Sequence, residues 1–196
     1  MITNIVNKKY EKGLSLIESA MVLALAATVT AGVMFYYQSA SDSNKTQNAI
    51  SEVMSATSAI NGLYIGQTSY TGLDAGILLN TSAIPDNYKD TSKNKITNPF
   101  GGYLNVGPST GTSYGYYLTL DGLDKSACVS LSTLNLGTSA KGYGVNIGTD
   151  SVGGWTSFSD SLTGANAAKS SAITPAEAAA ACNAENSGNT VTYFMK

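Results

Sequence analysis

Residues 8–18 read Lys-Lys-Tyr-Glu-Lys-Gly-Leu-Ser-Leu-Ile-Glu and lead directly into an apolar stretch that continues to Tyr37. A helix of 24 residues, from Leu14 to Tyr37, would be roughly 36 Å long, against about 30 Å of bilayer hydrocarbon. The stretch is therefore long enough to cross a membrane, and Glu18 is the one formal charge within it. An isolated ionisable residue is costly in such a place, which makes Glu18 a candidate functional residue.

The charges around this stretch predict its orientation. Residues 1–13 contain three lysines and one glutamate, a net charge of +2, whereas the rest of the chain carries a net charge of −4. Positive charge before an apolar segment keeps that end in the cytoplasm, so the remainder of the chain is expected outside. A weakly acidic body without arginine makes few phosphate contacts, so no nucleic-acid partner is expected.

The chain of 196 residues contains no histidine. This removes the commonest general base, the histidine-activated serine or cysteine nucleophile, and the commonest transition-metal ligand. We recognise no cluster of candidate catalytic residues, and we expect no metal and no cofactor. A membrane-anchored secreted enzyme stays open as an alternative.

Cys128 and Cys182 lie 54 positions apart and form no CxxC motif. If the chain is exported, a disulfide between them is the natural interpretation. Closing a loop of this size would stabilise the fold by about 4 kcal/mol on the chain-entropy model. Two buried free thiols are the alternative.

A helical pattern continues beyond the apolar stretch. Apolar and small residues recur at steps of three or four, at Ile50, Val53, Thr57, Ile60 and Tyr64, with Ala49, Met54, Ala56 and Leu63 beside them. No proline occurs before Pro85. The pattern predicts a continuous helix from about residue 14 to about residue 62, apolar on all sides in its first half and amphipathic in its second.

The remaining sequence predicts strands and one further helix. Residues 66–112 are expected to be a long connection with short pieces of structure, and residues 148–170 an exposed excursion. Strands are expected at residues 114–120, 127–131, 143–147 and 191–195. Thr174-Pro-Ala-Glu177 predicts the capping box of an alanine-rich helix. Asp121-Gly-Leu-Asp124 resembles a calcium loop only loosely, and a turn between strands is preferred.

Four interpretations of the N-terminal junction compete. A secretory signal peptide cut after Ala31 fits the basic start, but not Glu18 inside the apolar core. A plain signal anchor gives Glu18 no role, and a soluble core helix is disfavoured by the unbroken apolar surface. The remaining interpretation is a prepilin, cleaved between Gly13 and Leu14 so that the apolar helix stays on the product.

The stretch from Lys12 to Glu18 resembles the processing site of type IV pilins. In that family a membrane peptidase cuts after the glycine and methylates the new N-terminal amine, and the fifth residue of the product is glutamate, here Glu18. The leader of 13 residues and Leu14 after it are similar to the type IVb subgroup. The resemblance covers the whole chain and includes the stretches 13–21, 96–102, 133–144 and 192–196.

This resemblance implies an α+β protein with the type IV pilin fold. A long N-terminal α-helix would pack on an antiparallel β-sheet, and a disulfide from Cys128 to Cys182 would bound the C-terminal region. Three parts are implied. Residues 1–13 are a leader peptide that is removed, residues 14–37 form the membrane anchor and filament core, and residues 38–196 form the globular head with the second half of the helix.

The resemblance also implies a function, the major structural subunit of a type IVb pilus. The subunits would form a homopolymer whose fibres bundle and mediate autoaggregation and adherence to the host cell surface. Expected partners are a prepilin peptidase and a pilus assembly machinery of ATPase, inner-membrane platform and secretin. The precursor would lie in the inner membrane, with its leader cytoplasmic and its head periplasmic, before it joins the extracellular pilus. A type II secretion pseudopilin or a minor pilin is the alternative.

Three residues carry the implied chemistry. Gly13 and Leu14 flank the cleaved bond, Leu14 receives the N-methyl group, and Glu18 directs subunit assembly. A carboxylate in an apolar filament core needs a cation, and the one available at this depth is the Leu14 amine of a neighbouring subunit. The alternative is that Glu18 only favours the positive end of the helix dipole, an effect worth under about 1 kcal/mol.

Overall fold

The computed structural model describes residues 15–196. They belong to two compact units, which divide between Ser41 and Asp42. Helix α1 (Leu16–Leu63) supplies the described part of the first unit and the first element of the second. The prediction of one continuous helix up to about residue 62 is therefore confirmed. The leader and the cleavage-site residues Gly13 and Leu14 lie outside the described residues.

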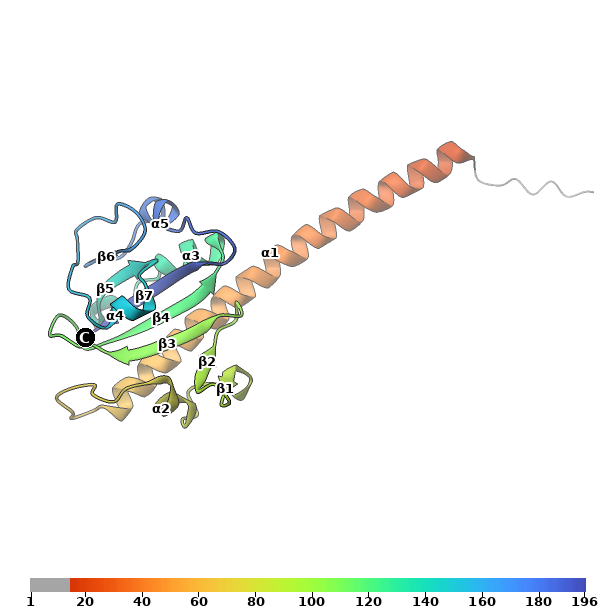
Figure 1. The fold of residues 1–196 in the computed structure, drawn as a ribbon. Coiled ribbons are helices and arrows are strands. Elements are labelled where there is room, and N and C mark those ends of the chain that lie inside the picture. Colours follow the sequence, from red (N-terminus) through yellow and green to blue (C-terminus); the bar gives the residue numbers. More distant parts are fainter. Residues whose placement is uncertain (1–14) are drawn as a thin grey trace, which may run out of the picture. The chain divides into compact units, whose positions relative to one another are not determined.

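The second unit, residues 42–196, is the head, an α+β structure built on one sheet (Figure 1). Its helices after α1 are α2 (Ala75–Leu79), η1 (Asp86–Tyr88), α3 (Lys125–Ser132), η2 (Gly137–Ser139), α4 (Thr149–Val152) and α5 (Pro175–Ala181). Its strands are β1 (Lys89–Asp90), β2 (Lys95–Thr97), β3 (Tyr103–Pro108), β4 (Tyr116–Leu123), β5 (Ala140–Val145), β6 (Ala167–Lys169) and β7 (Asn189–Met195). They pair antiparallel in the order β1-β2-β3-β4-β7-β5-β6.

The C-terminal strand β7 lies in the middle of the head, between β4 and β5 (Figure 1). All five residues of β7 from Val191 to Met195 are buried. Successive side chains of a strand point to opposite faces, so both faces of the sheet must be covered at β7. Accordingly, Tyr193 belongs to one hydrophobic cluster and Phe194 to another.

The larger cluster packs helices against the sheet. It combines side chains of α1, α3 and α5 with side chains of β3, β4 and β7, among them Ala49, Val53, Ala56, Ile60, Leu104, Leu118, Leu120, Leu131, Ala178 and Tyr193. The amphipathic character predicted for the second half of α1 is confirmed. The predicted stripe is buried or half-buried. Beside it, Met54 and Leu63 are 58% and 48% exposed, and Glu52, which the pattern does not predict on this face, is buried.

The strand predicted at residues 127–131 is wrong, because these residues lie in helix α3. The buried side chains Ala127, Cys128, Leu131 and Ser132 follow helical spacing. Alternation of larger and smaller apolar residues over five positions does not distinguish a strand from a short helix. The missed signal was Asp124, whose side chain accepts the Ala127 N–H at 2.7 Å as an N-cap.

The two acidic residues at 121 and 124 form neither a calcium loop nor a turn between strands. Asp121 lies in β4, where its carboxylate accepts the Tyr103 N–H at 2.6 Å and the Asn105 amide at 2.8 Å. The register of β4 against β7 shifts between Leu120 and Leu123. Gly122 provides this irregularity with φ of +71°, a conformation that favours glycine.

Residues 148–170 are less exposed than predicted. Val152, Leu162 and Ala168 are buried, so the segment covers part of the head rather than leaving it. Trp155 and Phe158 pack beside the second cluster, which contains Phe194. The aromatic residues of this segment are therefore part of the packing.

A disulfide joins Cys128 on α3 to Cys182 at the C-terminal cap of α5. The two Cα atoms are 5.9 Å apart and both residues are buried. The bond links two short helices that the larger cluster also contacts.

Glu177 connects α5 to the segment before it. Its carboxylate accepts hydrogen bonds from the Leu162 N–H at 3.0 Å, from the Lys169 ammonium at 2.8 Å and from the Thr174 N–H at 2.9 Å. The predicted capping box is present, with Pro175 at the helix start. These contacts lower the pKa of Glu177 to about 2. The ammonium of Lys169 contributes most, and the two backbone N–H donors add to it.

We expect loss of the disulfide to destabilise the head without unfolding it completely. Replacing Cys128 and Cys182 by alanine removes a constraint on the unfolded chain and should lower the free energy of unfolding by about 4 kcal/mol. Chemical denaturation followed by circular dichroism measures this change. A variant as stable as the parent would contradict the expectation.

Glu177→Gln should lower the thermal midpoint of the head at pH 7. The folded-state pKa of Glu177 is about 2, below the ordinary 4.5, so its stabilising contribution is complete above 4.5 and is lost as the pH falls towards 2. Thermal unfolding curves at pH 7, 4 and 2 should therefore show a difference between parent and variant that shrinks with acidification. A difference independent of pH would contradict this explanation.

Candidate functional site

The first half of α1 presents apolar side chains in every direction. Its large apolar residues have exposed fractions of 60–88%, namely Leu16, Ile17, Met21, Val22, Leu23, Leu25, Val29, Val33, Met34, Phe35, Tyr36 and Tyr37. An 18-residue window of α1 reaches a mean hydropathy of 1.8 with none of its residues buried. By length and composition, α1 is able to cross a membrane.

The serine and threonine hydroxyl groups at positions 19, 28 and 30 of this apolar segment bond within the helix itself. Ser19 donates to the Ser15 carbonyl at 3.0 Å, Thr28 to the Ala24 carbonyl at 3.1 Å, and Thr30 to the Ala26 carbonyl at 2.8 Å. Such back-bonding leaves no hydroxyl donor of these three residues unpaired in an apolar medium. The segment is therefore suited to lipid or to a packed bundle of like helices.

Glu18 is the exception among these polar groups. Its side chain is exposed, and Oε2 accepts the Ser15 N–H at 2.8 Å in the first turn of α1. This bond is half of a capping box, so the local role in helix capping is real. It does not neutralise the charge, and no lysine occurs between Glu18 and Lys45.

The structure brings Glu18 to the start of the apolar helix, as the sequence predicts. The other two residues of the predicted assembly site, Gly13 and Leu14, lie outside the described residues. The pairing of Glu18 with a Leu14 amine therefore stays a prediction.

A second acidic residue of α1, which the sequence did not single out, lies inside the head. Glu52 is only 3% exposed, and neither of its carboxylate oxygens has a hydrogen-bond partner among the described residues. Burial raises the pKa of Glu52 from 4.5 to about 8. Glu52 follows Ala49 by three positions and precedes Ala56 by four, so it lies on the same face of α1 as these two buried residues.

Glu52 lines a small cavity between α1 and the segment that leads into β1. The cavity has a volume of about 150 Å³ and is bounded by Asn48, Ser51, Glu52, Ser55, Pro85 and Tyr88. Its walls are mostly small or polar side chains. A buried carboxyl without a partner among the described residues is unusual, since buried polar groups ordinarily have partners.

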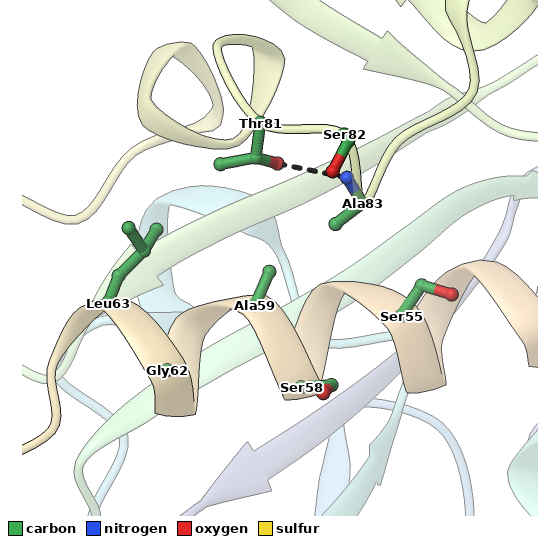
Figure 2. Close-up of a pocket in the computed structure, with 8 residues that line it drawn as sticks. All are labelled: Ser55, Ser58, Ala59, Gly62, Leu63, Thr81, Ser82 and Ala83. Atoms are coloured by element: carbon green, nitrogen blue, oxygen red, sulfur yellow. Dashed lines mark hydrogen bonds between the residues drawn. The ribbon is translucent and has the colours of Figure 1, made fainter.

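An open groove runs along the next turns of α1 (Figure 2). Its lining comes from α1 and from the loop after α2, and comprises Ser55, Ser58, Ala59, Gly62, Leu63, Thr81, Ser82 and Ala83. Ala59 and Leu63 point toward the loop, in which the Ala83 N–H donates to Thr81 Oγ1 at 3.3 Å. Ser55 borders both the groove and the Glu52 cavity, so the two features are neighbours.

Solved structures establish the likeness of the fold. A type IVb pilin from Salmonella typhi aligns with a TM-score of 0.55 and 19% identity, over 79% of this chain and 99% of that one. TcpA, a type IV pilin from Vibrio cholerae El Tor biotype, aligns with a TM-score of 0.53 and 20% identity, over 76% of this chain and 98% of that one. The predicted fold class, a long helix with an antiparallel sheet and a C-terminal disulfide, is confirmed.

Sequence comparison gives a closer relationship. The family model named Bundlin matches residues 38–196. The major structural subunits of bundle-forming pilus from Escherichia coli O127:H6 (strain E2348/69 / EPEC) and from Escherichia coli O111:H- are each 77% identical to this chain, over 100% of both sequences. The chain therefore belongs to the bundlin family.

Proposed function

We propose that this protein is the major structural subunit of a type IVb pilus, a homopolymeric filament outside the cell. The observation that carries the proposal is the continuous exposed apolar surface of residues 16–37 on one helix. Such a surface is not stable in water and marks a place of contact with lipid or protein. A bilayer covers it before assembly, and copies of the same helix cover it in the filament.

The proposal assigns three parts to the chain. Residues 1–13 are the leader, residues 14–37 the anchor and filament core, and residues 38–196 the head. A prepilin peptidase cuts between Gly13 and Leu14 and methylates the Leu14 amine. The basic leader supports a cytoplasmic position for the N-terminus and a periplasmic one for the head.

Assembly and adhesion follow from this proposal. An ATPase, an inner-membrane platform and a secretin move the subunit from the inner membrane into the growing pilus. The fibres bundle, which the names of the two Escherichia coli relatives support. Autoaggregation and adherence to the host cell surface follow from the resemblance to type IVb pilins. The role is structural rather than enzymatic, which a chain without histidine supports.

Glu18 sets the register of each incoming subunit in this scheme. Its ionised carboxylate pairs with the Leu14 amine of a neighbouring copy, because an unpaired charge inside an apolar core is strongly unfavourable. Any other axial position leaves both charges unpaired.

Electron microscopy of cells with and without the gene tests the function. Long bundled fibres that contain this protein are expected only when the gene is present. Cells that export the full chain and its assembly machinery yet form no fibres would contradict the proposal.

The protein recovered from fibres should begin at Leu14 and carry the mass of one additional methyl group. Intact-mass measurement and N-terminal sequencing check both features together. A start at Gly32, as a secretory signal peptide cut after Ala31 requires, would contradict the prepilin interpretation.

Glu18→Ala and Glu18→Gln should both abolish fibres while leaving the subunit processed and membrane-bound. Glutamine retains an oxygen that accepts the Ser15 N–H but carries no charge, so this pair separates the capping role from the ionic one. Fibre yield by microscopy and leader removal by mass are the measurements.

Glu185→Gln is the matched control, because Glu185 is an exposed glutamate of the head that pairs with Lys125 at 2.6 Å. It should assemble normally, since surface ion pairs contribute little. If Glu18→Gln assembled as well as the parent, Glu18 would act through its hydrogen bond alone and the ionic pairing would be wrong.

A further inference from the structure

Glu52 is a buried acidic side chain that has no partner in the described part of the chain. Its carboxylate oxygens are out of contact with water and have no hydrogen-bond partner among residues 15–196. A buried polar group in this state costs stability, and an ionised one costs more. The subunit alone therefore gives no reason for a glutamate at this position.

The charged groups around the cavity either bind other side chains or form no bond to Glu52. On the segment beside it, the Lys89 ammonium pairs with Asp86 at 2.8 Å, and Asp90 accepts hydrogen bonds from Ser92 and Lys93. On α1, the other charged residues of the head are Asp42 and Lys45, and neither bonds to Glu52. The remaining titratable group of the lining is the Tyr88 hydroxyl.

We propose that the Glu52 cavity is a subunit-docking site that receives a lysine ammonium from a neighbouring copy of this chain in the fibre. The inference rests on the proposed function, because it requires the homopolymer. In the free subunit the Glu52 carboxyl is neutral and closed off. In the fibre it turns toward the cavity, releases its proton to solvent and binds the ammonium as a carboxylate.

Charge decides the kind of occupant. One carboxylate and one ammonium leave no net charge in the buried site, which is the condition for a stable buried pair. A divalent cation would leave an excess positive charge and usually needs six or more oxygen ligands, several of them carboxylates. Lysine is the only cationic side chain in a chain without arginine or histidine.

The size and walls of the cavity suit this occupant. A volume of about 150 Å³ holds an ammonium and the end of its apolar stem, since one liquid water takes about 30 Å³. Asn48, Ser51 and Ser55 supply polar groups for the remaining ammonium protons. The adjoining groove of small side chains leaves space beside α1 for an approaching chain (Figure 2).

Three lysines are available to make the contact. The ammonium groups of Lys45, Lys141 and Lys196 form no ion pair or hydrogen bond with another described residue. Lys141 is an exposed residue of β5, and Lys196 is the exposed last residue. The other lysines of the head are already held by an acidic side chain or, for Lys95, by the Tyr103 ring.

Glu52→Gln should stabilise the free subunit near neutral pH. The folded-state pKa of about 8 lies above the ordinary 4.5, so the parent takes up a proton on folding between these values and loses stability as the pH rises through them. The ratio of the parent's unfolding constant to that of the variant should therefore rise about tenfold per pH unit between pH 4.5 and pH 8. Denaturation of the full-length subunit in detergent measures the effect.

The same substitution should weaken the fibre. Purified Glu52→Gln fibres at pH 7 should release subunits about tenfold faster than parent fibres, because an amide cannot form the ionic pair. Sedimentation after dilution measures the release, and Glu185→Gln fibres serve as the matched control. A buried glutamate with no docking role predicts a more stable subunit and an unchanged fibre.

Lysine variants identify the partner. One of Lys45→Gln, Lys141→Gln and Lys196→Gln should match the loss seen with Glu52→Gln, and the double variant should lose no more than either single one. The inference would be overturned if Glu52→Gln fibres released subunits as slowly as parent fibres. It would also be overturned if the effect of Glu52→Gln on release added to that of each of the three lysine substitutions in the double variants. Either result leaves the proposed function intact, which fails only if the parent chain forms no fibres.

Discussion

The apolar surface of residues 16–37 is the constraint on which the rest of the molecule depends. Its large side chains are exposed on every side of the helix, and the hydroxyl groups of Ser19, Thr28 and Thr30 already bond to the helix backbone. None of the described residues covers this surface, and we propose that lipid or other copies of the helix cover it. Because both environments are apolar, one helix is able to serve as anchor and as filament core without refolding.

The acidic residues show three ways in which a carboxylate is accommodated here. Glu177 has an ammonium and backbone donors within 3.0 Å and is fully ionised in the head. Glu18 has a single backbone donor and an exposed position at the start of an apolar helix. Glu52 has no hydrogen-bond partner among residues 15–196, and burial raises its pKa to about 8. The first residue is satisfied within the subunit, whereas for the other two we propose a positive partner from a neighbouring subunit.

Local signals predicted the parts of the fold that depend on short-range physics. The absence of proline before Pro85 and the spacing of apolar residues predicted α1, and the capping box at Thr174 predicted α5. The same kind of signal exists for α3, where Asp124 caps the helix, but alternation over five residues predicts a strand there instead. Short elements with few apolar residues depend on which faces become buried, and that is decided by β7 and the larger cluster rather than by the segment itself.

The residues of the candidate site also fall into those that the sequence predicts and those that only the tertiary structure identifies. The sequence by itself determined the family resemblance, the apolar helix, Glu18 at its start and the two cysteines, because each of these is a matter of local composition and spacing. Only the tertiary structure decided that Glu52 lies in the core with no partner among the residues that the structure describes, and that residues 148–170 pack on the sheet. Burial arises from segments distant in the chain, here Pro85 and Tyr88 against α1, so no local pattern specifies it.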